Sequence, residues 1–190
     1  MKYEKTIQLK DGRTCLLRGA GPEDAAAVLA IFLKTHAETD YLTSYPDECI
    51  FTEEQEREYL AGKDQSGNAV EIIAILDGAV VGSAGIDPVG GAEKVRHRAS
   101  FGIGIEKASW GLGIGRALTN ACIECAKAAG YRQLELEAVA ANQTALALYR
   151  SVGFVEYGRN PRGFRSRLTG WQELTLMRLE LDERTESGSK

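Results

Sequence analysis

The stretch Ser109-Trp110-Gly111-Leu112-Gly113-Ile114-Gly115-Arg116 decides how this chain folds. An extended apolar run, residues 101–105, precedes it, and a helical apolar run, residues 117–129, follows it. This order predicts a strand, a glycine-rich turn and a helix. Glycines let a ligand approach the backbone closely, and a helix start offers free N–H groups and a positive dipole end. The stretch predicts a phosphate or pyrophosphate site, although a glycine turn that serves packing alone would have the same pattern.

Length and composition favour one globular domain. The chain has 190 residues, 44% of them hydrophobic and 26% charged, and a formal net charge of −4. That charge argues against a nucleic-acid partner. No apolar run approaches the roughly 20 residues that cross a bilayer. The first residues, Met1-Lys2-Tyr3-Glu4-Lys5, lack the apolar segment of a signal peptide. We therefore expect a cytoplasmic protein with no membrane partner.

The pattern of the four cysteines favours a structural place in the core over metal binding or redox chemistry. Cys122 and Cys125 fall on one face of an expected helix, but there is no second Cys-x-x-Cys pair and the only histidines are His36 and His97. Such a set is too sparse for a typical metal or redox site. We expect no metal and no cysteine nucleophile.

The elements expected before the glycine turn are hairpins and helices. Asp-Gly turns at residues 11–12 and 77–78 each separate two extended segments, which is typical of β-hairpins. A helix is expected from residue 22, where a proline is followed by two acids. The capping box Thr52-Glu53-Glu54-Gln55 predicts a second helix to about residue 62. Between the helices, residues 38–51 form a polar, aromatic loop.

The elements expected after the turn alternate. They are a helix over residues 116–129, a strand over 134–139, a helix capped by Asn142, a basic loop over 158–170 and a last strand over 171–181. The basic loop carries Arg159, Arg162, Arg165 and Arg167. The order predicts an α/β (α+β) fold, with a mixed central sheet and helices on both faces. We assign residues 1–181 to a single domain and the polar residues 182–190 to a frayed tail.

Two stretches together resemble a known family. The first is the glycine turn. The second is Asn142-Gln143-Thr144-Ala145-Leu146-Ala147-Leu148-Tyr149-Arg150-Ser151-Val152-Gly153-Phe154. They resemble the acetyl-CoA motif and the following Asn-x-x-Ala-x-x-x-Tyr…Gly-Phe signature of the GNAT superfamily, the Gcn5-related N-acetyltransferases. The resemblance covers roughly residues 5–181 and implies about seven strands, of which the fourth and fifth splay apart. One position departs from the motif, because Trp110 stands where the family has Gln or Arg.

The resemblance implies acetyl-CoA as co-substrate and assigns residues to it. Main-chain groups of the turn would hold the pyrophosphate, the fourth strand would pair with the pantetheine arm, and Asn142 would cap its helix or bind that arm. The implied cofactor-binding residues are Ile103, Gly104, Ile105, Trp110, Gly111, Leu112, Gly113, Ile114, Gly115, Arg116 and Asn142. For Arg116, a solvated surface arginine is an equal alternative.

Three residues are implied in catalysis. Tyr149 lies seven residues after Asn142, on the same helix face, and would be the general acid for the thiolate of CoA. The alternative for Tyr149 is a core tyrosine. An amine acceptor also needs a general base. Glu137 is the first choice and Glu106 the second, while Glu135 shares a face with Glu137 and would serve instead. For each carboxylate the alternative is a solvated strand-edge group.

The function implied is N-acetyl transfer from acetyl-CoA to a primary amine in a ternary complex. Two other readings stay open: a non-catalytic acyl-CoA sensor, and a Rossmann-type oxidoreductase with Glu135 about 20 residues after the turn. The acceptor is a small-molecule amine or a protein N-terminus, and residues 38–51 and 159–167 are expected to border its site. The basic loop would alternatively serve the CoA 3′-phosphate or a homodimer contact.

Overall fold

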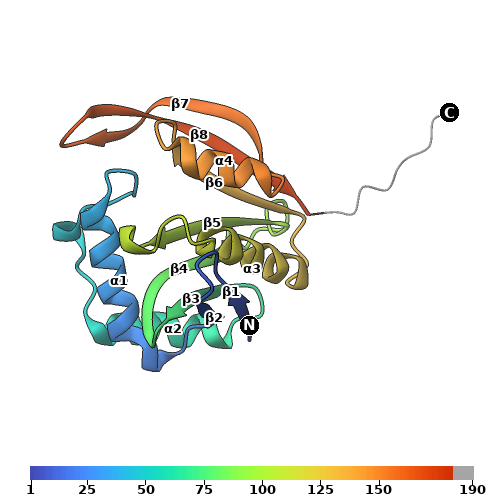
Figure 1. Cartoon of the computed structure of the whole chain (residues 1–190). Helices are drawn as coiled ribbons and strands as arrows, with labels where there is room; N and C mark the ends of the chain where they lie inside the picture. Colours follow the sequence, from blue (N-terminus) through green and yellow to red (C-terminus); the bar gives the residue numbers. More distant parts are fainter. Residues whose placement is uncertain (182–190) are drawn as a thin grey trace.

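The computed structural model describes residues 1–181, with helices and strands ordered along the chain as Figure 1 shows. The expected tail, residues 182–190, lies outside the described residues. The strands are β1 Glu4–Gln8, β2 Thr14–Gly19, β3 Val70–Leu76, β4 Ala79–Pro88, β5 Arg98–Ile105, β6 Gln133–Val139, β7 Val155–Ser166 and β8 Gly170–Glu180. The α-helices are α1 Ala25–Glu38, α2 Glu53–Gln65, α3 Ile114–Ala128 and α4 Gln143–Ser151. Three short 3-10 turns are η1 Pro22–Asp24, η2 Pro46–Glu48 and η3 Lys107–Ser109.

The described strands form one mixed sheet in the order β1-β2-β3-β4-β5-β6-β8-β7. Within residues 1–181, β5 and β6 are the only parallel pair, and every other neighbouring pair is antiparallel. That single parallel pair is joined through α3, as a parallel connection requires. The Rossmann alternative is therefore wrong, because that fold is built from repeated parallel units.

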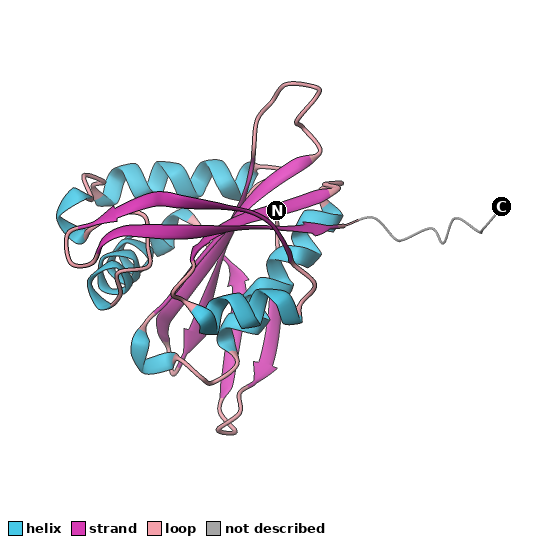
Figure 2. Ribbon diagram, turned by 90° about the horizontal axis from the view of Figure 1, so that it is seen from above, coloured by secondary structure: helices cyan, strands magenta, loops and turns pink. Residues whose placement is uncertain are grey.

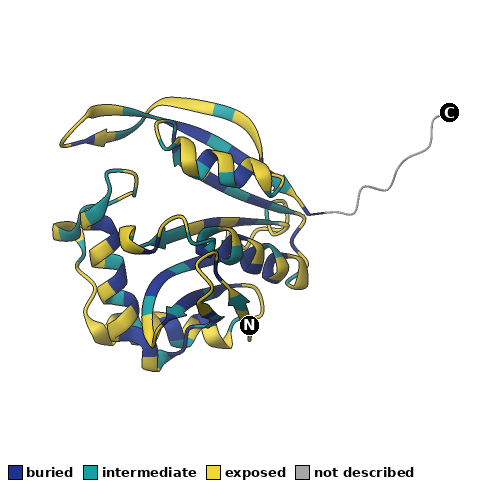
Figure 3. Ribbon diagram, in the orientation of Figure 1, coloured by how far each residue is buried: buried dark blue, intermediate teal, exposed yellow. Residues whose placement is uncertain are grey.

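Helices cover both faces of the sheet, as predicted, and Figure 2 shows the strands crossing the molecule between them. Helices α1 and α2 pack on one face, and α3 and α4 on the other. The larger apolar core lies on the α3 face and includes Ile72, Leu118 and Leu134. A smaller cluster, with Val28 and Leu60, lies on the α1 face. Figure 3 shows burial concentrated along the sheet, while the edge strand β7 is mostly exposed.

Local signals explain the helix starts. Thr52 Oγ1 accepts a hydrogen bond from the Gln55 N–H, and Gln55 Oε1 accepts one from the Thr52 N–H. The predicted capping box therefore forms, and α2 begins there. Asn142 Oδ1 accepts from the Ala145 N–H at 3.2 Å, so Asn142 caps α4. Helix α3 begins at Ile114, two residues earlier than predicted, with Gly113 as its N-cap.

Three details differ from the sequence prediction. The sheet has eight strands instead of about seven, because β7 adds an edge strand next to β8. The expected basic loop is largely strand, since β7 runs to Ser166 and pairs with β8 through two register shifts. Cys15, Cys122 and Cys125 lie in the core as expected, whereas Cys49 is half-buried in the loop before α2. No helix within residues 1–181 is long and apolar enough to span a membrane.

Candidate active site

The sheet opens between β5 and β6, as predicted for the fourth and fifth strands of the family. The two strands pair only from Arg98–Gln133 to Ser100–Glu135. Beyond these residues β5 stays paired with β4 as far as Ile105 but has no partner on its other side, while β6 stays paired with β8 as far as Val139 and Leu174. The opening is visible in Figure 1 as the divergence of β5 from β6 and β8.

The backbone of β5 turns unpaired groups toward this opening. Arg98 O accepts from Val89 N and Glu106 N donates to Val81 O, so both groups point to β4. Antiparallel pairing alternates, and the register with β4 is continuous. The N–H and C=O groups of Ile103 and Ile105 therefore point away from β4, toward the side that β6 has left. They form a free strand edge that an extended ligand can join.

The glycine turn at the start of α3 presents free N–H groups. Gly111 and Gly113 have φ of +79° and +102°, and a Cβ at either would meet no atom within 4 Å. The first helical hydrogen bond runs from Ala117 N to Gly113 O. The preceding N–H groups of the helix have no intrahelical acceptor, as at any helix start. An anion is stabilised at such a terminus by these donors and by the helix dipole.

Trp110 joins the turn to β5. Its Nε1 donates a 2.7 Å hydrogen bond to Ile105 O, while 48% of the residue stays exposed. The indole N–H thus occupies the C=O group of Ile105. The N–H and C=O groups of Ile103 and the N–H of Ile105 remain available to a ligand. Sequence reasoning assigned Trp110 to the site but gave it no such bond.

Lys10 lies beside the glycine turn, a neighbour that the sequence did not predict. Its backbone N–H donates to Leu112 O at 3.2 Å, which brings the β1–β2 turn beside the glycine turn. Lys10 and Arg116 are both exposed there. The only sequence signal was a lysine beside an Asp-Gly turn, which is common at surfaces and has no functional meaning by itself.

Tyr149 lies on the α3 face of the sheet. It is 7% exposed and packs edge-on against Phe101, with ring centroids 6.1 Å apart. Burial raises the pKa of Tyr149 to about 12, so its hydroxyl is protonated at neutral pH. That hydroxyl has no hydrogen-bond partner among residues 1–181.

The three candidate bases differ in their surroundings. Glu106 accepts from Lys34 and from Ser109 Oγ, and the Lys34 ammonium lowers its pKa. Glu135 is held by Arg98, whose guanidinium lowers its pKa in the same way. Glu137 is exposed and has no hydrogen bond or ion pair within the described chain.

Glu137 and Tyr149 lie on opposite faces of the sheet. On β6, Glu137 alternates with the core residues Leu134 and Leu136, so it faces away from α3. On β5, Gly104 faces Thr35 of α1, at 3.2 Å for a built Cβ. Glu137 therefore belongs to the α1 face. The two groups can reach one molecule only through the opening between β5 and β6.

The two segments expected beside the acceptor are in contact. Asp40, in the loop after α1, accepts hydrogen bonds from Ser166 and Gln172 of the β7–β8 hairpin. Two arginines of the hairpin form ion pairs within the protein. Arg159 pairs with Glu156 and Glu173, and Arg167 pairs with Asp47. Arg162 and Arg165 each lie 5.5 Å from the Trp171 ring centroid.

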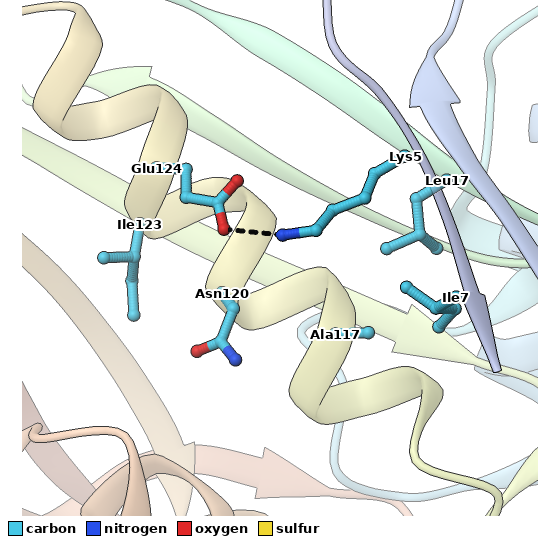
Figure 4. Close-up of a pocket in the computed structure, with 7 residues that line it drawn as sticks. All are labelled: Lys5, Ile7, Leu17, Ala117, Asn120, Ile123 and Glu124. Carbon is cyan, nitrogen blue, oxygen red and sulfur yellow. Dashed lines mark hydrogen bonds and ion pairs between the residues drawn. The ribbon is translucent and has the colours of Figure 1, made fainter. Parts of the chain in front are cut away.

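A separate pocket of about 340 Å³ contains none of the predicted site residues. It lies between β1–β2 and α3, and an ion pair of 3.0 Å between Lys5 and Glu124 crosses it (Figure 4). Its other lining residues are Ile7, Leu17, Ala117, Asn120 and Ile123. Within residues 1–181, no three His, Cys, Asp or Glu side chains gather as metal ligands would.

Comparison with known proteins identifies the family. The sequence profile of the "Acetyltransferase (GNAT) family" matches residues 31–154. This chain belongs to the GNAT acetyltransferase family. The match runs from the middle of α1 to the residue before β7, and thus contains the glycine turn, the opening of the sheet and Tyr149 of this GNAT protein.

Individual relatives agree with the family. The chain is 30% identical over 115 residues to L-amino acid N-acyltransferase MnaT of Escherichia coli, covering 60% of this chain and 66% of MnaT. It is 36% identical over 101 residues to N-alpha-acetyltransferase RimI of Mycobacterium tuberculosis, covering 53% and 60%. Both alignments thus span slightly less than two thirds of the relative's length.

Solved structures share the whole fold. The GNAT acetyltransferase of Streptococcus pneumoniae superposes with a TM-score of 0.84 at 31% identity, covering 88% of this chain and 99% of that one. Two other solved structures of this fold contain bound acetyl-CoA. Because they are only 21% and 20% identical to this GNAT protein, they show only that it has the same fold.

Proposed function

We propose that this GNAT protein transfers the acetyl group of acetyl-CoA to a primary amine by direct attack in a ternary complex. The observation that carries the proposal is the free edge of β5 at Ile103 and Ile105, which leads from the glycine turn into the opening between β5 and β6. A long ligand with an anionic end and an amide-containing arm matches this combination of a helix start and a free strand edge.

Acetyl-CoA would lie with its pyrophosphate on the N–H groups from Gly111 to Arg116. Lys10 and Arg116 supply positive charge at the same turn. The pantetheine arm would pair with the backbone groups of Ile103 and Ile105, which flank Gly104 on the free edge, and Asn142 would add its free amide N–H, since its Oδ1 already caps α4. Leu112 and Ile114 shape the turn, and Trp110 fixes its edge.

Tyr149 would act as general acid. The amine nitrogen attacks the thioester carbonyl carbon, the C–S bond breaks, and the departing thiolate takes the Tyr149 proton. A raised pKa keeps that proton on the hydroxyl until it is needed. The absence of a protein partner for the hydroxyl within residues 1–181 fits a group whose partner is the ligand.

Glu137 would act as general base, directly or through a water. An alkylammonium has a pKa near 10.4, so the acceptor must lose a proton before it attacks. Glu137 is open to solvent, whereas Glu106 and Glu135 are engaged by cations that lower their pKa and occupy their oxygens. These contacts favour Glu137 over the other two.

Thiol release from acetyl-CoA tests the proposal with a panel of amino acids, polyamines, aminoglycosides and peptides. We expect release with at least one amine and an acetylated product of the matching mass. Tight CoA binding without release for any amine would favour an acyl-CoA sensor. Failure to bind CoA at all would overturn the assignment of the β5–β6 opening.

A further inference from the structure

The end of α1 is fastened to both sides of the opening between β5 and β6. Glu38 Oε2 accepts the Lys107 N–H at 2.6 Å, directly after β5, and Lys34 pairs with Glu106 beside it. Two residues later, Asp40 Oδ2 accepts from Ser166 Oγ at 2.6 Å and from Gln172 Nε2 at 2.9 Å, in the β7–β8 hairpin. We call residues 38–40 the strap.

The strap is short. Two residues of fully extended chain cover at most about 7 Å. Glu38 and Asp40 therefore hold the end of β5 and the β7–β8 hairpin close together, at the end of the sheet where β5 and β6 diverge. Figure 1 shows the loop after α1 rising toward the hairpin at this end.

The hairpin side of the strap is held by several bonds. Asp40 also accepts from Thr169 Oγ1 at 3.1 Å and from Tyr45 OH at 3.3 Å. Tyr45 OH in turn accepts the Arg167 N–H at 2.7 Å. Ser166, the donor nearest to Asp40, is 9% exposed. The half-buried carboxylate of Asp40 thus accepts from four neutral donors. Moving the hairpin away from Asp40 would leave each donor on the hairpin without that partner, so the contact is specific.

The position of the strap bears on the acceptor. Glu137, the proposed base, faces the α1 side of the sheet, and the strap leaves α1 on that side. A small amine needs only to bring its amino group to Glu137. A polypeptide must also leave the site as a chain, past the end of β5 and the β7–β8 hairpin, which the strap holds together. It would have to break the contacts of Asp40.

We infer that the strap restricts the acceptor to small amines and that Asp40 is the residue that sets this limit. The inference rests on the proposed N-acetyl transfer and narrows its substrate class. The acceptor would be a molecule of amino-acid size, and a protein N-terminus would be excluded while the strap is closed. Asp40 is a specificity-determining residue here and takes no part in proton transfer.

A length series of acceptors tests the inference on the unmodified protein. Each L-amino acid, its amide and a pentapeptide that begins with it are compared by thiol release and product mass. We expect kcat/KM for the best small acceptor to exceed that of its pentapeptide at least tenfold. Equal or faster acetylation of pentapeptides would overturn the inference. Absence of thiol release with every amine would instead overturn the proposed function, so the two failures are distinguishable.

Asp40→Ala tests the role of the residue. We expect the ratio of small-acceptor to pentapeptide kcat/KM to fall at least threefold, with KM for acetyl-CoA unchanged. Ser166→Ala removes the shortest bond of Asp40 and should shift the ratio in the same direction, which keeps the test valid if Asp40→Ala does not fold. Asp77→Asn removes a charge at the β3–β4 turn and should leave the ratio as it is. An unchanged ratio in both strap variants would overturn the role of Asp40.

Discussion

The indole Nε1 of Trp110 donates a hydrogen bond of 2.7 Å to the carbonyl oxygen of Ile105. This bond links the start of the glycine turn to the last residue of the free edge of β5. It also explains how a tryptophan can stand where the family has Gln or Arg, because the indole N–H acts as a side-chain donor at the edge of the turn. Through this bond, the pyrophosphate end and the strand end of the proposed acetyl-CoA site have a fixed relative position.

Trp110→Phe should weaken acetyl-CoA binding. The substitution removes a hydrogen bond worth about 1 kcal/mol, so we expect KM for acetyl-CoA to rise about fivefold with kcat within twofold. Initial-rate kinetics at saturating amine measure both. Trp171→Phe, at the other tryptophan and outside the turn, is the matched control and should change neither. A KM that does not move in Trp110→Phe would show that the bond does not position the cofactor.

Tyr149→Phe should lower turnover without unfolding the protein. The ring and its contact with Phe101 remain, and the lost hydroxyl has no partner within the described chain, so stability should stay the same. General acid catalysis contributes about 10²–10⁴-fold, and we expect kcat to fall about 100-fold with CoA affinity nearly unchanged. Single-turnover kinetics and a CoA titration measure the two effects. Equal turnover would remove Tyr149 from the mechanism.

The pH profile gives a second test of Tyr149. Its pKa is raised to about 12 by burial, so the proton-bearing form persists well above neutral pH. We therefore expect kcat to hold steady between pH 8 and about pH 10 in the unmodified protein. A fall in kcat with an apparent pKa near that of a free tyrosine, about 10, would contradict a buried acid.

Paired carboxylate variants should identify the general base. Glu137→Gln removes an exposed carboxylate without a protein partner, so we expect kcat to fall at least tenfold and thermal stability to stay the same. Glu106→Gln breaks the pairing with Lys34 and should act chiefly on stability. The comparison is made by kcat and by thermal unfolding of the same preparations. A larger loss of kcat in Glu106→Gln than in Glu137→Gln would mean that Glu106, and not Glu137, is the general base.

Local signals in the sequence predicted most of the fold. The capping box, the Asp-Gly turns and the glycine turn each act through bonds between near neighbours, and each formed as expected. The strand β7 was missed because residues 158–165 contain glycine, asparagine and proline, which favour turns and loops. What makes this segment a strand is pairing with β8, which supplies the partners that its own sequence does not indicate.

The site was predictable where its residues belong to a motif and not where distant segments meet. Tyr149 and Asn142 share one helix, so their spacing placed them together. The bonds of Asp40 join residues more than 120 positions apart, and no local pattern marks them. Lys34 and Glu106 also pair across 72 positions, and this pairing distinguishes Glu106 from Glu137, which looked alike in the sequence.

Stability should depend on Asp24 in a pH-dependent manner. Arg18 donates two hydrogen bonds of 2.7 Å to its carboxylate, and the Gly21 N–H donates a third at 2.9 Å. The Arg18 guanidinium lowers the pKa of Asp24 in the folded protein. The unfolded value is near 3.9, so this stabilisation is complete above about pH 5 and is lost as pH falls through the lower folded pKa.

Asp24→Asn should therefore destabilise the protein by about 2 kcal/mol at pH 7, the scale of a buried hydrogen bond to a charged group. The difference from the unmodified protein should shrink as the pH falls below about 4, because the Asp24 carboxyl of the unfolded state then binds a proton while the folded state still holds the charged form. Urea unfolding at pH 7 and pH 3 measures it. Glu124→Gln, which breaks an exposed pair with Lys5, should cost less than about 1 kcal/mol at either pH. An Asp24→Asn effect that is the same at both pH values would mean that shape, and not charge, holds the η1 turn to β2.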